Sequence, residues 1–205
     1  LQDVLVYLGR VERGKAVEPA YRLSMGAHKG EATSKSCQFQ RPVFPFVRTS
    51  PVALINFESI LHNPHFFNDK HGSLFNLALS TEDREMTTKL LRARGVGLRL
   101  KCDVHVHMNA WAAAFDHPYF TVTDEQGRFE ISGIPPGSYT LVAWHAGYNI
   151  VKFAASRPVY DEPHVIRQAT TMSPNGQAEY RFEFPVRPVE VDWKIAGGDG
   201  ELPPE

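Results

Sequence analysis

The segment 102–108 (CDVHVHM) constrains this chain more than any other, because it holds a thiol, two imidazoles and a thioether within seven residues. Leu98 to Val106, a run that overlaps this segment, alternates apolar and polar side chains, which predicts a half-buried strand. Cys102 falls on the same face of that strand as Leu98 and Leu100, so its sulfur should point inward. We expect a tight loop to follow and to present His105 and then Met108.

A further imidazole lies upstream, where His62 and Asn63 occur in the run 60–66 (ILHNPHF). Two imidazoles and a thiolate, with a weakly bound Met as the axial ligand, form a donor set that selects copper. The spacing therefore predicts a metal site built from His62, Cys102, His105 and Met108. A buried structural cysteine and a core-filling methionine remain the alternatives for Cys102 and Met108.

The C-x2-H-x2-M loop and the H-N-x-H-F segment resemble amicyanin and the wider cupredoxin family. Residues 117–148 resemble secreted bacterial proteins labelled methylamine-utilisation or carboxypeptidase-regulatory-like. Together the resemblance covers residues 37–148, somewhat over half of the chain. It implies a Greek-key β-sandwich, one copper ion, electron transfer and a location outside the cytoplasm, in the periplasm or the extracellular space.

The same resemblance implies roles for other residues. His62 is favoured over His65 as a ligand because Asn63 follows it, and in cupredoxins that Asn ties the ligand loops together. His107 is expected at the rim of the site. His65 and His107 nevertheless remain possible alternative ligands. The electron should leave through His105 at an apolar rim, for which the candidate docking residues are Phe66, Phe67 and Trp111.

The pattern of the whole chain is almost entirely β. Strands are expected over residues 3–8, 42–47, 52–57, 98–106 and 138–144, with strand, turn and strand over 120–131. Residues 61–80 read as a loop and 170–186 as a closing hairpin. One short helix is expected over 81–94, because Thr81 can cap it and acidic residues crowd its first turn.

The run from Thr123 to Leu141, TD-x2-G-x-F-x-I-x-G-x-PPG-x-Y-x-L, resembles the second half of a transthyretin-like or carboxypeptidase-regulatory-like β-module. We therefore expect a cupredoxin-like sandwich merged with such a module. The predicted divisions are an N-terminal strand and extension (1–36), a core (37–148) that includes the module at about 115–148, a closing extension (149–194) and a flexible tail (195–205).

Composition excludes several classes of function. The net charge is −1, and no run of five or more basic residues occurs, which argues against a nucleic-acid surface. No apolar stretch approaches the 18 residues that would indicate a membrane span. No leader is evident at Leu1, so a secreted form would already have been processed. Cys37 is left without a partner if Cys102 binds metal, and a buried thiol is the expectation for it.

The leading interpretation is a copper protein that carries single electrons and is not an enzyme, since hydrolase and phosphate-loop motifs are missing. A c-type cytochrome or a dehydrogenase is the partner that the resemblance implies. Two alternatives remain open. One is a structural β-sandwich subunit of a larger redox or cell-surface complex, with copper absent or vestigial. The other is copper handling or catalysis at an open, His-rich site.

Overall fold

The structure is a computed structural model, and it describes residues 1–12, 14, 19–27, 36–68, 70, 72–80, 84–147, 150–154 and 157–185. Within these residues every regular element is a strand, as the all-β prediction requires. The predicted tail at 195–205 lies outside the described residues. In the described part, no helix has the length and apolar character needed to cross a membrane.

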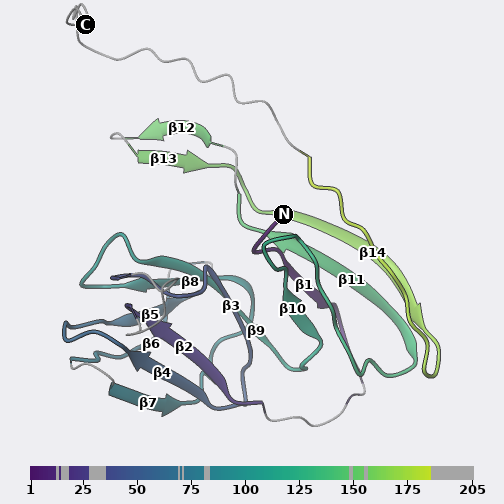
Figure 1. Cartoon of the computed structure of the whole chain (residues 1–205), viewed down its shortest axis with the longest axis horizontal. Coiled ribbons are helices and arrows are strands. Elements are labelled where there is room, and N and C mark those ends of the chain that lie inside the picture. The colour runs from purple at the N-terminus through teal and green to yellow at the C-terminus, as the bar shows by residue number, and fades with distance from the viewer. Residues whose placement is uncertain are drawn as a thin grey trace, which may run out of the picture.

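Two sheets form a sandwich at one side of the molecule (Figure 1). The larger sheet has the order β3 (Val43–Val47), β9 (Asn109–Phe115), β8 (Gly95–Cys102), β5 (Pro64–Phe67) and β6 (Ser73–Asn76). Strands β3 and β9 run parallel, and the other neighbours in this sheet are antiparallel. The smaller sheet has the order β2 (Tyr21–Met25), β4 (Val52–Asn56) and β7 (Arg84–Thr88).

The interior between these two sheets is the main hydrophobic core. Because successive side chains of a strand point to opposite faces, the inward residues of β8 are the alternate positions Leu98, Leu100 and Cys102. All three are buried in this core, together with Phe46 and Phe66. The prediction that Cys102 points inward from the end of its strand is therefore confirmed.

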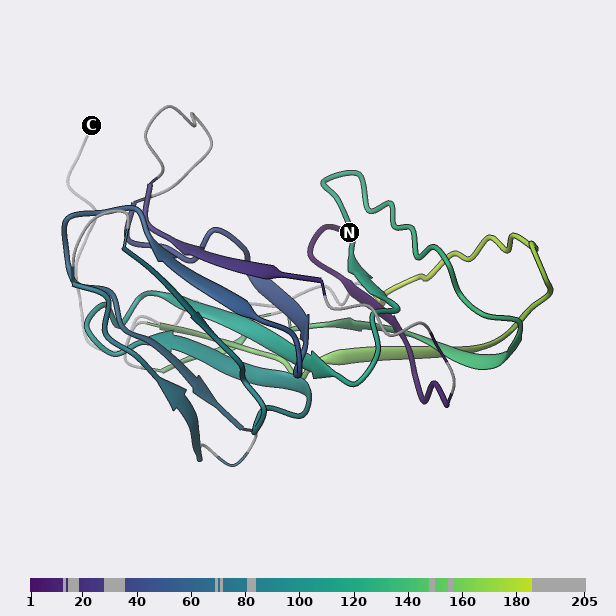
Figure 2. The ribbon, with the colours of Figure 1, turned by 90° about the horizontal axis from the view of Figure 1, so that it is seen from below.

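A second unit lies beside the sandwich, as both views show (Figures 1 and 2). Its sheet has the order β10 (Phe120–Val122), β1 (Leu5–Leu8), β11 (Gly137–His145) and β14 (His164–Met172), all antiparallel. We call it the second module. Strands β12 (Ile150–Ala154) and β13 (Arg157–Tyr160) form a separate hairpin. A cluster of Leu5, Val43, Ala113, Phe115 and Trp144 joins the two units.

Several predictions of local structure are wrong. Only Phe120–Val122 (β10) of the expected strand, turn and strand over 120–131 is a strand, and the strand expected over 98–106 ends at Cys102. Residues 84–88 of the expected helix form strand β7, which pairs with β4, and residues 81–83 lie outside the described part. Leu90 and Ala93, beyond the strand, are buried in the main core, so tertiary packing overrides the helical composition. The expected loop at 61–80 contains the strands β5 and β6. Each has four residues, which is too short for an alternation of apolar and polar side chains to be recognised.

The expected hairpin at 170–186 is only partly formed. The turn is present, since Gly176 N–H donates to the Ser173 carbonyl at 3.0 Å. The chain then returns beside β14, where the Tyr180 hydroxyl bonds to Thr170, but residues 177–185 do not form a strand. The regular partner of β14 is β11. Val186 lies outside the described residues.

Candidate metal centre

Cys102 is the last residue of β8, and its side chain is 3% exposed. The loop after it closes on itself. Cys102 N–H donates to the Met108 carbonyl at 3.2 Å, and Met108 N–H donates to the His105 carbonyl at 2.9 Å. These bonds curl the segment around the sulfur and return the chain to β9, as the spacing of the motif predicts.

His62 lies in the loop before β5 and is fixed by a bridge to Leu79, with backbone N–H···O distances of 3.0 and 2.8 Å. Its side chain is 0% exposed. Its Nε2 is 2.8 Å from Oε2 of Glu58. A carboxylate can only accept, so Nε2 carries a proton. In the neutral ring Nδ1 keeps a free lone pair, whereas in the charged ring Nδ1 carries a second proton and can donate it to the Cys102 thiolate. Nδ1 is buried and has no hydrogen-bond partner among the described residues.

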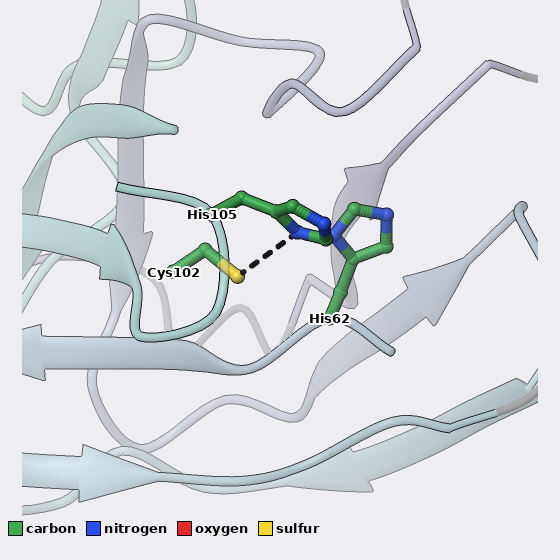
Figure 3. Close-up of side chains that lie close together, drawn as sticks. All are labelled: His62, Cys102 and His105. Carbon is green, nitrogen blue, oxygen red and sulfur yellow. Dashed lines mark hydrogen bonds between the residues drawn. The ribbon is translucent and has the colours of Figure 1, made fainter. Parts of the chain in front are cut away.

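These side chains converge at one point (Figure 3). One ligand atom from each of His62, Cys102 and His105 lies within 4.8 Å of the other two. Cys102 Sγ is 3.7 Å from His105 Nδ1, and the two imidazole ring centroids are 4.9 Å apart. The structure thus brings together three of the four residues of the predicted donor set, from two loops forty residues apart.

The surroundings of Cys102 favour its thiolate. Burial alone would raise the pKa of the thiol, but the neighbouring His62 imidazole and the backbone N–H groups of Asn63, His105 and Val104 outweigh burial and lower the pKa from 9.0 to about 6. Asn63 N–H donates to Sγ at 3.3 Å. The thiolate is the form that binds metals, so this environment prepares the sulfur for one.

Glu58 accepts a hydrogen bond from His62 Nε2, and the sequence analysis does not identify this residue. Burial opposes its ionisation, but hydrogen bonds from His62, from the backbone of Cys37 and Ala27, and from Ser36 together lower the pKa of its carboxyl. Cys37 N–H donates to Oε2 at 3.1 Å. No pattern in the sequence pairs Glu58 with His62, because a four-residue separation brings side chains together only in a helix.

Met108 and Asn63 occupy the places expected for them, though their roles as axial ligand and clamp remain predictions. Met108 is 1% exposed and belongs to the core cluster beside Cys102. Asn63 ties the two loops together through its backbone. Its N–H donates to Cys102 Sγ, and its carbonyl accepts from Asp103 N–H at 3.3 Å. Its side-chain oxygen is buried without a partner in the described residues.

The two alternative imidazoles are engaged elsewhere. His65 Nδ1 lies 2.8 Å from Asp103 Oδ2, and its Nε2 lies 2.8 Å from Ser73 Oγ, on the outer face of the larger sheet. His107 is exposed, and its Nε2 donates to the Cys37 carbonyl at 3.0 Å. Neither belongs to the three-residue cluster, which favours His62 over His65.

The predicted docking rim needs correction. Phe66 is 0% exposed and packs in the core against Phe46 and Phe75, because it takes the inward position of β5. Phe67 and Trp111 are half-buried on the outer sheet face. Phe67 stacks on His65, and Trp111 lies under the Arg99 guanidinium at 4.0 Å. The residues next to the candidate ligands in the sequence whose apolar side chains are exposed are instead Ile60, Leu61, Val104 and Val106, here called the apolar rim.

Copper fits the residues present. The buried, unpartnered Nδ1 of His62 is costly unless a partner binds it, and it faces a thiol whose low pKa supplies a negative sulfur. Two imidazole nitrogens, a thiolate and a nearby thioether match the preferences of copper and include too few oxygen donors for Mg²⁺ or Ca²⁺.

Comparisons with known proteins give partial likenesses. A sequence family described as polysaccharide lyase family 4, domain II matches residues 103–154. No curated protein matches the chain significantly. The purple cupredoxin from Nitrosopumilus maritimus is 14% identical, with 46% of this chain and 99% of that chain covered and a TM-score of 0.36.

Two further solved structures are similar to the same extent. Amicyanin from Paracoccus versutus is 14% identical, with 56% of this chain and 100% of that chain covered and a TM-score of 0.36. Pseudoazurin from Hyphomicrobium denitrificans is 13% identical, with 47% of this chain and 75% of that chain covered and a TM-score of 0.34. Values this low do not assign the chain to a family, and its function has to be inferred from the site itself.

Proposed function

We propose that this protein binds one copper ion through His62, Cys102, His105 and Met108 and carries single electrons between redox partners. The observation that carries the proposal is the lone pair of His62 Nδ1. Nδ1 is fully buried and has no partner among the described residues, and a nitrogen of the same ring lies within 4.8 Å of the Cys102 and His105 donor atoms. When bound, copper would supply a reversible one-electron couple.

The residues of the chain would hold that couple in a fixed environment. Glu58 orients the His62 ring, and Asn63 N–H supports the Cys102 sulfur. The closed loop from Cys102 to Met108 limits movement of His105. Fixed donors reduce the rearrangement that accompanies a change of charge, which is the requirement for an electron carrier rather than for a catalyst.

The apolar rim supports a route for the electron. Val104 and Val106 flank His105 in sequence and are exposed, Val106 by 75%. Ile60 and Leu61 precede His62 and are also exposed. His105 is less buried than His62 and Cys102. Exposed apolar side chains next to the ligands in the sequence suit the small, transient interfaces of electron-transfer proteins.

The location and partners remain proposals that follow from the resemblance to cupredoxins. We place the protein in the periplasm or outside the cell, and we expect a c-type cytochrome or a dehydrogenase as the partner.

The test is addition of one equivalent of Cu(II) to purified protein, followed by visible and paramagnetic resonance spectra. An intense thiolate-to-copper band with narrow copper hyperfine splitting is expected. It should be lost in Cys102→Ala and retained in Cys37→Ala, the matched control for the second thiol. A protein that stays colourless and does not retain copper contradicts the proposal and favours the structural β-sandwich subunit instead.

A further inference from the structure

A hydrogen-bonded group on the outer face of the larger sheet lies directly behind the candidate metal centre. Cys102 points into the core, whereas the next residue, Asp103, contacts His65 and Asn76 on the outer face. Cys102 is buried and Asp103 is exposed. Asp103 accepts from His65 Nδ1 at 2.8 and 3.0 Å and from Asn76 Nδ2 at 2.9 Å. Its carboxylate thus joins the end of β8 to β5 and β6.

The proton positions in this group follow from chemistry. Because the carboxylate of Asp103 only accepts, His65 carries its proton on Nδ1, and its Nε2 accepts from the Ser73 hydroxyl at 2.8 Å. Asn76 Nδ2 lies 3.1 Å from His65 Nδ1, but both are then donors, so its bond runs to Asp103. Each polar atom of the group has one consistent role.

We propose that Asp103 is a positioning residue for the metal centre. Held by His65 and Asn76, it fixes the exit of the chain from β8 and thereby the inward direction of the Cys102 sulfur. The inference rests on the proposed function. Asp103 N–H also donates to the Asn63 carbonyl at 3.3 Å, while Asn63 N–H donates to Sγ. A shift of Asp103 would therefore disturb both loops around the sulfur.

Ser73, His65 and Asp103 are joined in the order of nucleophile, base and carboxylate found in serine hydrolases. Their surroundings favour positioning over hydrolysis. All three belong to a sheet face, and none lines the cavities of about 670, 340 and 430 Å³ located in the second module and beside β2 and β3.

The experiment compares Asp103→Ala, Asp103→Asn and the matched control Ser73→Ala in a Cys37→Ser background. We expect Asp103→Ala to weaken copper binding about tenfold, as the loss of a group that orients a metal ligand commonly does, and to shift the thiolate-to-copper band. Asp103→Asn should recover part of the affinity, since its amide oxygen still accepts from His65. Ser73→Ala should match the parent, because Ser73 does not touch Asp103.

A second measurement needs no copper. In the metal-free protein, alkylation of Cys102 by iodoacetamide should be faster in Asp103→Ala than in the parent, at denaturant concentrations where both remain folded. An Asp103→Ala protein with the parent's band, affinity and alkylation rate overturns the inference. So does covalent labelling of Ser73 by a fluorophosphonate, which would indicate a catalytic group. A parent protein without copper binding contradicts the proposed function, while the alkylation rates still decide the role of Asp103.

Discussion

Cys37 N–H donates to Oε2 of Glu58 at 3.1 Å, and the same oxygen accepts from His62 Nε2 at 2.8 Å. The second cysteine of the chain is therefore linked through one carboxylate to the buried imidazole of the candidate metal centre. A segment that the sequence leaves without any role thus contributes to the orientation of a proposed ligand.

Glu58→Ala should weaken copper binding by about tenfold, because His62 then loses the acceptor that fixes its ring and its tautomer. The copper affinity of Glu58→Gln should lie between those of Glu58→Ala and the wild type, since the amide oxygen still accepts from His62 Nε2. Competition with a copper chelator measures the affinity. Glu85→Ala, on the exposed strand β7, is the control, and an equal loss in that variant would contradict a specific role for Glu58.

Gly26→Ala should destabilise the protein and weaken its copper binding. Gly26 has φ of +79°, a region that costs other residues about 1–3 kcal/mol, and a Cβ there would overlap the Glu58 side chain. Gly133→Ala is a matched control, because its φ is +68° and nothing lies within 4 Å of its added Cβ. Urea unfolding measures the loss of stability that both variants should show because of their positive φ. Only Gly26→Ala should also change the copper affinity.

The two thiols of the metal-free protein should titrate separately. Cys102 should ionise near pH 6, and Cys37 above 9.0, since burial, Glu58 and Cys102 raise the pKa of Cys37. Thiolate absorbance followed against pH should show two steps, and Cys102→Ser should remove the lower one. A single step near the ordinary thiol pKa would show that the site does not favour the thiolate.

The sign of the linked stability follows from the lowered pKa. Between about pH 6 and 9.0 the unfolded state binds a proton at Cys102 that the native state does not. The stabilisation from Cys102 is therefore fully present above 9.0 and is lost as the pH falls through about 6. His62, whose pKa is raised by Cys102 and Glu58 against the effect of burial, contributes in the opposite direction as the pH rises.

Val106→Asp should slow electron exchange with a redox partner and leave the copper spectrum unchanged. The residue is 75% exposed on the loop that carries His105, so the substitution charges the proposed docking surface without entering the core. Val151→Asp, on the exposed side of β12, is the control. Stopped-flow kinetics with a small cytochrome c measure the rate, and equal effects of the two substitutions would argue against docking at this rim.

The positions of strands were predictable where apolar and polar residues alternate over a long run of sequence. The inward direction of Cys102 follows from Leu98 and Leu100, and the strand from Gly137 to His145 was recognised in the same way. Strand β7 was not predictable, because its residues favour a helix locally and become a strand only through pairing with β4. Such a pairing is a long-range property that local propensity does not contain.

The residues of the candidate site were predictable from the sequence. The positions of the side chains around them were less predictable. The motif spacing indicated Cys102, His105 and His62. Asn63 favours His62 over His65 in the sequence, and the partners of His65 on the outer face agree with that choice. Phe66 was misplaced because a four-residue strand gives too little alternation to tell its faces apart.

Strand β1 lies between β10 and β11 in the sheet of the second module. In the sequence, β1 precedes all strands of the sandwich, whereas β10 and β11 follow them. Tyr7 pairs with Phe120, and Leu8 N–H donates to the Tyr119 carbonyl at 3.0 Å, which places the chain's departure to the sandwich beside its return. The sandwich is thus an insertion whose two ends meet. During synthesis β1 is therefore made more than a hundred residues before β10 and β11, and the whole proposed copper-binding part is made between them.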